Sequence, residues 1–140
     1  MKLEPLARAE LKYRQIDYVD FAPGGHYIGV MDGTLSGERL SGSLFLVNAP
    51  PKRPDDVNMP TLSGILSTGD GAKVFVQLNG IALRQEDRRH FVTSVLMRSG
   101  DQRYAWVNQV FGVMEGILSQ GDTAIASLYL CHPTIEPPAS

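Results

Sequence analysis

Short runs in which apolar and polar residues alternate recur along the chain, and glycine-rich turns separate them. The clearest run covers 66–83, where Gly69-Asp70-Gly71 supplies a tight hairpin turn and a β-branched, alternating strand follows. One face of that strand carries Lys73, Phe75, Gln77 and Asn79, and the other carries Val74, Val76 and Leu78. Because both faces carry bulky side chains, neither is a simple solvent face. The pattern predicts one strand of a closed barrel whose interior holds a few polar groups among apolar ones.

The same alternation predicts strands along the rest of the chain and no long helix. The expected strands cover 11–21, a bent segment within 26–43, 44–47, 62–68, 72–83, 91–98, 104–118 and 123–131. Turn residues such as Ser99-Gly100-Asp101 connect them. This set of strands predicts an all-β fold: a single closed antiparallel β-barrel of about eight strands, lipocalin-like in general architecture and without an exposed edge.

The segments between and beyond these strands are a long loop, a charged connection and two chain ends. Residues 48–58 are rich in proline, cannot form a regular ladder, and are expected to cross one mouth of the barrel as a candidate lid. The charged cluster 84–89 is expected to be a solvated connection. We expect residues 1–140 to form one domain, with a short polar lead before Leu11 and a proline-rich tail over 132–140.

Composition argues against several classes of protein. The chain of 140 residues is long enough for one barrel to bury a core without cross-links. Its net charge of -2, with no basic run interleaved with aromatic residues, argues against nucleic acid as a partner. Cys131 is the single cysteine and cannot form an internal disulfide, and the first residues have no apolar run typical of a signal peptide. A membrane barrel would need such a signal and aromatic girdles, so the expected location is cytoplasmic.

Two carboxylates lie in apolar stretches and are the candidate catalytic residues. Asp32 stands between Met31 and Gly33, either pointing inward with a raised pKa or at a bend exposed to water. Glu115 lies in the apolar run 113–117, where it is either a second buried acid or a solvent-facing carboxylate at the barrel rim. A buried carboxylate whose pKa is raised can serve as a general acid or base.

Aromatic and amide side chains are the candidate substrate-binding residues. Tyr104, Trp106 and Asn108 share one face of an alternating segment, and an indole between a phenol and an amide suits a planar or hydrophobic ligand. Core packing is the alternative, because one indole can close a barrel end. Asn79, directly before Gly80, is expected either to orient a ligand carbonyl or to cap a turn.

The sequence has no pattern for a metal or an organic cofactor. His26, His90 and His132 are scattered, without the spacing of metal ligands among themselves or with Cys131. The glycines lie in predicted hairpins and do not precede helices, so no phosphate-binding loop, dinucleotide fingerprint or nucleophile elbow is recognised. We therefore expect no metal and no cofactor.

Two segments carry a resemblance to a known family. They are Ser-Thr-Gly-Asp-Gly-Ala-Lys-Val-Phe-Val-Gln-Leu-Asn-Gly at 67–80 and Gly-Asp-Gln-Arg-Tyr-Ala-Trp-Val-Asn at 100–108 followed by Val-Phe-Gly at 110–112. They resemble the domain-of-unknown-function 3237 family, and 29–42 is a weaker third match. The family usually has two glycines at Asp32-Gly33, an acidic residue near Arg98 and a glycine-rich loop ending in Asp-Trp. The resemblance implies a small antiparallel barrel, often dimeric, with no settled activity.

These observations lead to one main hypothesis for function and two alternatives. The barrel is expected to bind a small hydrophobic or aromatic molecule, as a cofactor-independent isomerase, cyclase or lyase in which Asp32 or Glu115 moves protons. The alternatives are a non-catalytic carrier of the same kind of molecule and a structural dimeric interaction module. Because the strand 72–83 carries bulk on both faces and a monomer buries only one of them, we also expect a homodimer.

Overall fold

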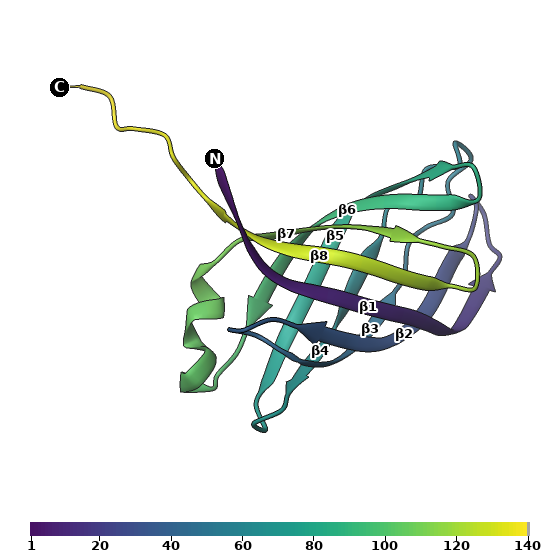
Figure 1. Cartoon of the computed structure of the whole chain (residues 1–140). Coiled ribbons are helices and arrows are strands. Elements are labelled where there is room, and N and C mark those ends of the chain that lie inside the picture. Colours follow the sequence, from purple (N-terminus) through teal and green to yellow (C-terminus); the bar gives the residue numbers. More distant parts are fainter. Residues whose placement is uncertain (140) are drawn as a thin grey trace.

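Eight antiparallel strands pair in chain order, and the last pairs with the first, so the barrel has no free edge (Figure 1). The computed structural model describes residues 1–139. The strands are β1 (Lys2–Val19), β2 (His26–Ser36), β3 (Gly42–Asn48), β4 (Thr61–Thr68), β5 (Lys73–Gln85), β6 (Arg88–Arg98), β7 (Gly112–Leu118) and β8 (Thr123–His132), with a 3₁₀ helix, η1 (Gln102–Gln109), between β6 and β7. The predicted all-β closed barrel is confirmed.

The inner faces of the strands form one aliphatic core. In β5, the apolar set Val74, Val76 and Leu78 is buried inside the barrel. The other set of side chains, which includes Phe75, lies on the outside. Leu66 of β4 is paired with Val74, and neither side chain has any exposed surface. The predicted division of β5 into two faces is confirmed, and closure of the barrel decides which face is inside.

The first strand begins at Lys2, so the expected polar lead before Leu11 is wrong. β1 pairs with β8 over 2–12 and with β2 over 8–19. Its irregularity at Pro5 falls where a missing N–H costs no regular ladder bond. The first part of this strand was not predicted from the sequence, because its pairing partner is β8, which is distant along the chain.

The expected strand over 104–118 is wrong in its first part, because residues 102–109 form η1. Asp101 caps this helix: its Oδ1 accepts a hydrogen bond from the backbone N–H of Arg103 at 2.9 Å. The side-chain hydrogen bond from the Arg103 guanidinium holds the pKa of the Asp101 carboxyl at about 2. Both contacts favour a helical turn over an extended chain directly after the β6 strand.

The helix closes one end of the barrel, at the left of Figure 1. In a 3₁₀ helix, residues three apart share a face, and Tyr104, Val107 and Val110 follow that spacing. Val107 is completely buried, and the other two pack against the core beside it. A period of three therefore replaces the expected period of two in this segment.

The connection between β5 and β6 is shorter than the charged cluster 84–89 suggests. Only Glu86 and Asp87 lie between the two strands, and the rest of the cluster belongs to β5 and β6. Arg89 consequently lies on the inner face of β6, with its side chain 21% exposed. The expectation of a solvated cluster is wrong for Arg89, because alternation along a strand turns every second side chain inward.

The long loop 49–60 crosses the mouth at the barrel end opposite η1, beside the connection between β5 and β6, as the sequence predicted. Asn58 and Ala82 of β5 exchange two backbone hydrogen bonds, at 3.1 and 2.8 Å. The backbone N–H of Tyr27 in β2 donates to the Pro50 carbonyl at 3.0 Å. The loop is therefore fixed to strands on two sides of the mouth.

The chain after β8 has no regular secondary structure over 133–139, the part of the expected proline-rich tail that follows this strand. His132, the first residue of that predicted tail, is the last residue of β8 and contacts Glu4 of β1. Ser140 lies outside the described residues. Within residues 1–139, no helix is both long and apolar enough to cross a bilayer.

Candidate functional site

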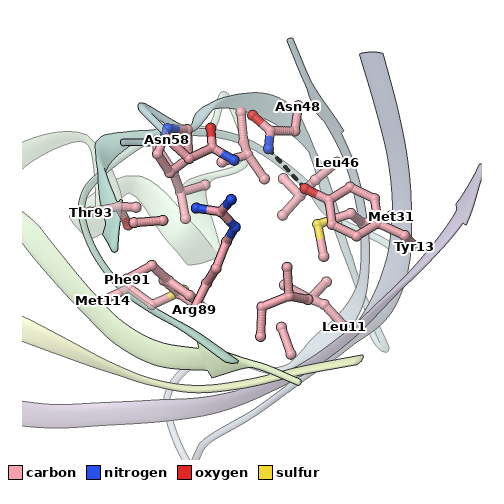
Figure 2. Close-up of a pocket in the computed structure, with 16 residues that line it drawn as sticks. Leu11, Tyr13, Met31, Leu46, Asn48, Asn58, Arg89, Phe91, Thr93 and Met114 are labelled. Atoms are coloured by element: carbon pink, nitrogen blue, oxygen red, sulfur yellow. Dashed lines mark hydrogen bonds between the residues drawn. The ribbon is translucent and has the colours of Figure 1, made fainter. Parts of the chain in front are cut away.

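A cavity lies inside the barrel beneath the loop 49–60, and every strand contributes to its wall (Figure 2). Its volume is about 60 Å³, well below the roughly 300–1,000 Å³ of pockets for drug-sized ligands. The apolar lining consists of Leu11, Met31, Leu46, Pro60, Leu62, Leu78, Ala82, Phe91, Met114, Leu118 and Ala124. The polar lining consists of Tyr13, Asn48, Asn58, Arg89 and Thr93. A largely apolar cavity with a few polar groups is the usual form of a small-molecule site.

Tyr13 and Asn48 form the polar pair on one side of the cavity. The Asn48 side-chain amide donates to the Tyr13 phenol oxygen at 2.8 Å, as the dashed line in Figure 2 marks. The Asn48 Oδ1 accepts from the backbone N–H of Thr61 at 3.0 Å, which fixes the orientation of the amide. Burial raises the pKa of the Tyr13 phenol. The phenol therefore keeps its proton at neutral pH and can donate a hydrogen bond.

Arg89 brings the positive charge of the cavity. Its guanidinium projects among the lining side chains, near Asn58 in the view of Figure 2. Nη1 donates to the Asp56 carbonyl at 3.4 Å, and Nη2 lies 3.3 Å from the Asp56 Oδ1. Both distances exceed those of a strong charge-assisted bond. Asp56 is shared, because Nε of Arg84 lies 3.5 Å from its Oδ2.

Thr93 is a buried hydroxyl without a hydrogen-bond partner among the described residues. It lies on the inner face of β6, and only 3% of the residue is exposed. A buried polar atom without a partner costs about 1–3 kcal/mol, so such atoms are rare and call for an explanation. A ligand in the cavity would give this hydroxyl a partner.

The charge inside the cavity is unbalanced. Among the described lining residues there is no Asp, Glu, His or Lys, and Arg89 is the single permanently charged side chain. Across residues 1–139, no three His, Cys, Asp or Glu side chains gather as a metal-binding group. The cavity therefore offers hydrogen-bond donors and one positive charge to whatever it holds, surrounded by apolar walls.

Both predicted acid–base residues lie on the outer surface of the barrel. Asp32 is on the outer face of β2, 49% exposed, with its Oδ2 at 3.2 Å from Nε of Arg14. Glu115 is exposed on the outer face of β7. The inward-facing alternative is wrong for both, because their neighbours Met31 and Met114 take the inner positions. Neither carboxylate has the burial that the acid–base hypothesis requires.

Tyr104, Trp106 and Asn108 are brought together in η1, at the barrel end opposite the cavity. The Tyr104 hydroxyl donates to Oδ2 of Asp70 at 2.9 Å. The Arg39 guanidinium lies over the Trp106 ring, 4.1 Å from its centre. The three side chains hold η1 against neighbouring turns, which agrees with the packing alternative.

Asn108 and Asn79 also lie outside the cavity. The Asn108 amide exchanges two hydrogen bonds with the Ser99 backbone, at 2.9 and 2.8 Å, and so fixes the connection from β6 to η1. Asn79 is exposed on the outer face of β5. It does not cap a turn, because β5 continues through Gly80 to Gln85. The strand backbones are close together at Gly80, where a Cβ atom would lie 1.9 Å from the Val92 carbonyl oxygen.

Sequence reasoning missed the five polar residues of the cavity, for two kinds of reason. Asn48 and Thr93 could have been found, since each continues the inner parity of its strand, after Leu46 and before Val95. Tyr13 continues the inner parity of Leu11, but the irregularity of β1 between residues 13 and 15 ends this alternation, so the residues that follow do not reveal it. The place of Arg89 in the cavity depends on the length of the β5–β6 hairpin, and that of Asn58 depends on the course of the loop 49–60.

A second hollow, of about 370 Å³, lies on the outer face of β6, β7 and β8. Glu115, His90 and Arg8 border it. It is larger than the cavity but more open, and its polar groups do not surround an enclosed apolar space. We therefore regard the cavity as the candidate site.

The comparisons with known proteins concern the fold. No protein-family model and no curated protein matches the chain. A β-barrel-like protein from Acinetobacter baumannii AYE is similar in structure, with a TM-score of 0.82, 19% identity, and coverage of 92% of this chain and 94% of that one. A conserved protein of unknown function from Rhodopseudomonas palustris has a TM-score of 0.79 and 18% identity, and the match covers 92% of this chain and 96% of that one.

A third similar structure is described as an enzyme from Penicillium herquei. Its TM-score is 0.65 at 16% identity, and the match covers 91% of this chain and 93% of that one. Identities this low show a common fold and carry no site residue from one protein to another. The chain is therefore similar to a group of small β-barrel proteins, and its function has to be argued from its own cavity.

Proposed function

We propose that this protein binds a small, largely apolar molecule in the cavity beneath the loop 49–60. The observation that carries the proposal is the wall itself: eleven apolar residues, drawn from the eight strands and the loop, surround five polar ones. A barrel that served only as a structural module would gain stability by filling this space with side chains. The resemblance to the domain-of-unknown-function 3237 family implies no settled activity, and it therefore does not identify a ligand.

Ligand binding should raise the melting temperature of the protein. A panel of small aromatic and aliphatic molecules, each tested by thermal unfolding, is expected to include compounds that stabilise it. At a concentration near 100 times its dissociation constant, a ligand adds about 2.7 kcal/mol, which corresponds to a shift of roughly 10 °C for a domain of this size. The size of the cavity favours compounds of few heavy atoms.

Matched variants locate the binding. Ala124 lines the cavity, so Ala124→Leu is expected to fill part of the space and abolish the shift. Asp32→Asn and Glu115→Gln alter only the outer surface and are expected to retain it. If no compound in a broad panel stabilised the parent protein, the structural-module alternative would replace this proposal.

The binding role is better supported than the catalytic one. An isomerase, cyclase or lyase needs an acid or base within reach of its substrate, and Asp32 and Glu115 are both outside the barrel. The similar protein from Penicillium herquei is described as an enzyme, but that likeness concerns the fold. We therefore propose a carrier or ligand-responsive protein first, and a cofactor-independent enzyme second.

We also propose that the protein is a homodimer. Phe45 of β3, Ile65 of β4 and Phe75 of β5 are cross-strand neighbours in one row on the outer face. All three are about 40–50% exposed. Contiguous apolar side chains of this kind on an outer sheet face are typical of interaction surfaces.

Sedimentation at micromolar concentration is expected to show a species of twice the chain mass. Phe75→Glu places a charge in the apolar row of the proposed interface and is expected to shift the protein to the monomer. Gln77→Glu, two residues along the same outer face, adds the same charge outside the row and serves as the control. A parent protein that sediments only as a 15.3 kDa monomer would contradict the dimer.

A further inference from the structure

The geometry points to a small organic monoanion, a carboxylate attached to an apolar body, as the ligand of the cavity, with Arg89 as its anchor. This inference rests on the binding function proposed above and names the chemical class of the ligand. It follows from three features: the hydrogen bonds that Arg89 leaves unused, the donors around it, and the absence of a competing acid among the described lining residues.

Arg89 has capacity for a ligand. A guanidinium carries five N–H groups in a planar fork that matches a carboxylate. Among the described residues, only Asp56 accepts from it, through one contact at each of two nitrogens. The Nε N–H and the second N–H of each terminal nitrogen are left for another acceptor.

Asp56 competes only weakly with a ligand for the Arg89 guanidinium. It belongs to the loop, its side chain is 66% exposed, and it is shared with Arg84. Exposed ion pairs of this kind contribute little, because water and salt screen them. A carboxylate on the protected side of Arg89 would meet a lower dielectric and would pair more strongly.

The other polar groups in the cavity can donate to an anion. Tyr13 accepts from Asn48 and still has its own O–H to donate. The Asn58 side chain adds an amide N–H₂, and Figure 2 shows it beside the Arg89 guanidinium. The Thr93 hydroxyl is buried in the same wall without a partner. A neutral hydrocarbon would leave these donors unpaired, whereas a carboxylate accepts from several of them.

The apolar body of the ligand has a place deeper in the barrel. Leu46, Leu78 and Met114 line the cavity and also border a void of about 20 Å³ deeper in the barrel. This deeper wall is entirely aliphatic or thioether. The head group is therefore expected at Arg89, near the mouth, and the body towards the core.

The test compares acids with neutral molecules of the same shape. Propanoate, butanoate and isobutyrate are titrated calorimetrically at pH 7 into the parent protein, alongside propanamide, butanamide and isobutyramide. At least one acid is expected to bind roughly 10- to 100-fold more tightly than its amide, the range for hydrogen bonds to a charged group. Arg89→Gln is expected to remove this preference. Arg88→Gln, which removes the same charge from the outer face of β6, is expected to keep it.

Two further variants separate recognition from folding. Arg89→Lys retains the charge without the fork and is expected to retain part of the preference. Thr93→Val removes the unpaired hydroxyl, and it is expected to raise the unfolding midpoint while weakening acid binding. An unchanged circular-dichroism spectrum in each variant shows that the barrel is intact.

The outcomes distinguish this inference from the function on which it rests. Amides that bind as tightly as their acids, or a preference that survives Arg89→Gln, would overturn the carboxylate assignment and leave the apolar pocket standing. Acids and amides that all fail to bind, when other apolar compounds raise the melting temperature, would also overturn it. If neither the acids nor the apolar panel binds, the proposed function itself fails.

Discussion

Replacing Leu66 with alanine is expected to lower the free energy of unfolding by about 3–5 kcal/mol, the upper range for a buried leucine. Leu66 has no exposed surface and is paired with the equally buried Val74. It already borders a void of about 20 Å³ in the deep part of the barrel. Removal of its side chain would enlarge that void, and a closed ring of strands has little freedom to collapse into it.

Urea unfolding of the parent and variant measures this loss. Leu83 provides the matched control, because it is a leucine on the outer face of β5 and is 44% exposed. Leu83→Ala is expected to lower the free energy of unfolding by less than about 1 kcal/mol. Equal losses at the two positions would contradict the assignment of Leu66 to the inside of the barrel.

Replacing Val107 with aspartate is expected to destabilise the protein by more than about 3 kcal/mol, because it places an unpaired charge in the barrel end. Val107 has no exposed surface, and it is the only residue of η1 that is fully buried. The substitution therefore tests whether η1 is the closure of this end.

The control is Ala105→Asp, two residues earlier in η1, where the side chain is exposed. That variant is expected to unfold within about 0.5 kcal/mol of the parent. Thermal and urea unfolding of both variants give the comparison. If Val107→Asp were as stable as Ala105→Asp, η1 would be a detachable helix, and the barrel would be open at both ends.

The two barrel ends have different physical roles, and this difference limits where a ligand can bind. At the η1 end, Val107 and the aliphatic side chains below it leave only the small void. At the other end, the interior is less well filled, and polar groups replace part of the core. The space inside the barrel therefore lies at the end beneath the loop 49–60, where Arg89 is part of its lining.

Much of the fold could be predicted from the sequence, because strands and tight turns are indicated by residues that are neighbours along the chain. The alternation in 72–83 and the Gly69-Asp70-Gly71 turn are properties of neighbouring residues, and they correctly indicated an antiparallel barrel. The prediction failed where another signal was stronger than alternation. In η1, the Asp101 cap and apolar residues three apart favour a 3₁₀ helix.

The candidate site could be predicted only in kind. A largely apolar pocket with a few polar groups was expected, but the residues named for it lie elsewhere: Asp32 and Glu115 on the outer surface, and Tyr104 and Trp106 in η1. Their local surroundings in the sequence looked apolar because the outer face of this barrel also carries apolar side chains.

The sequence by itself determined that the chain forms short alternating strands joined by tight turns, because a period of two and turn residues act over a few neighbouring positions. It could not determine which face of each strand is inside, because alternation separates two faces without saying which of them points inward, and both faces of this barrel carry apolar side chains. Only closure of the barrel decided that, by pairing β1 with β8. The same closure turned Arg89 and Thr93 towards Tyr13, from strands far apart in the chain, and so created the cavity.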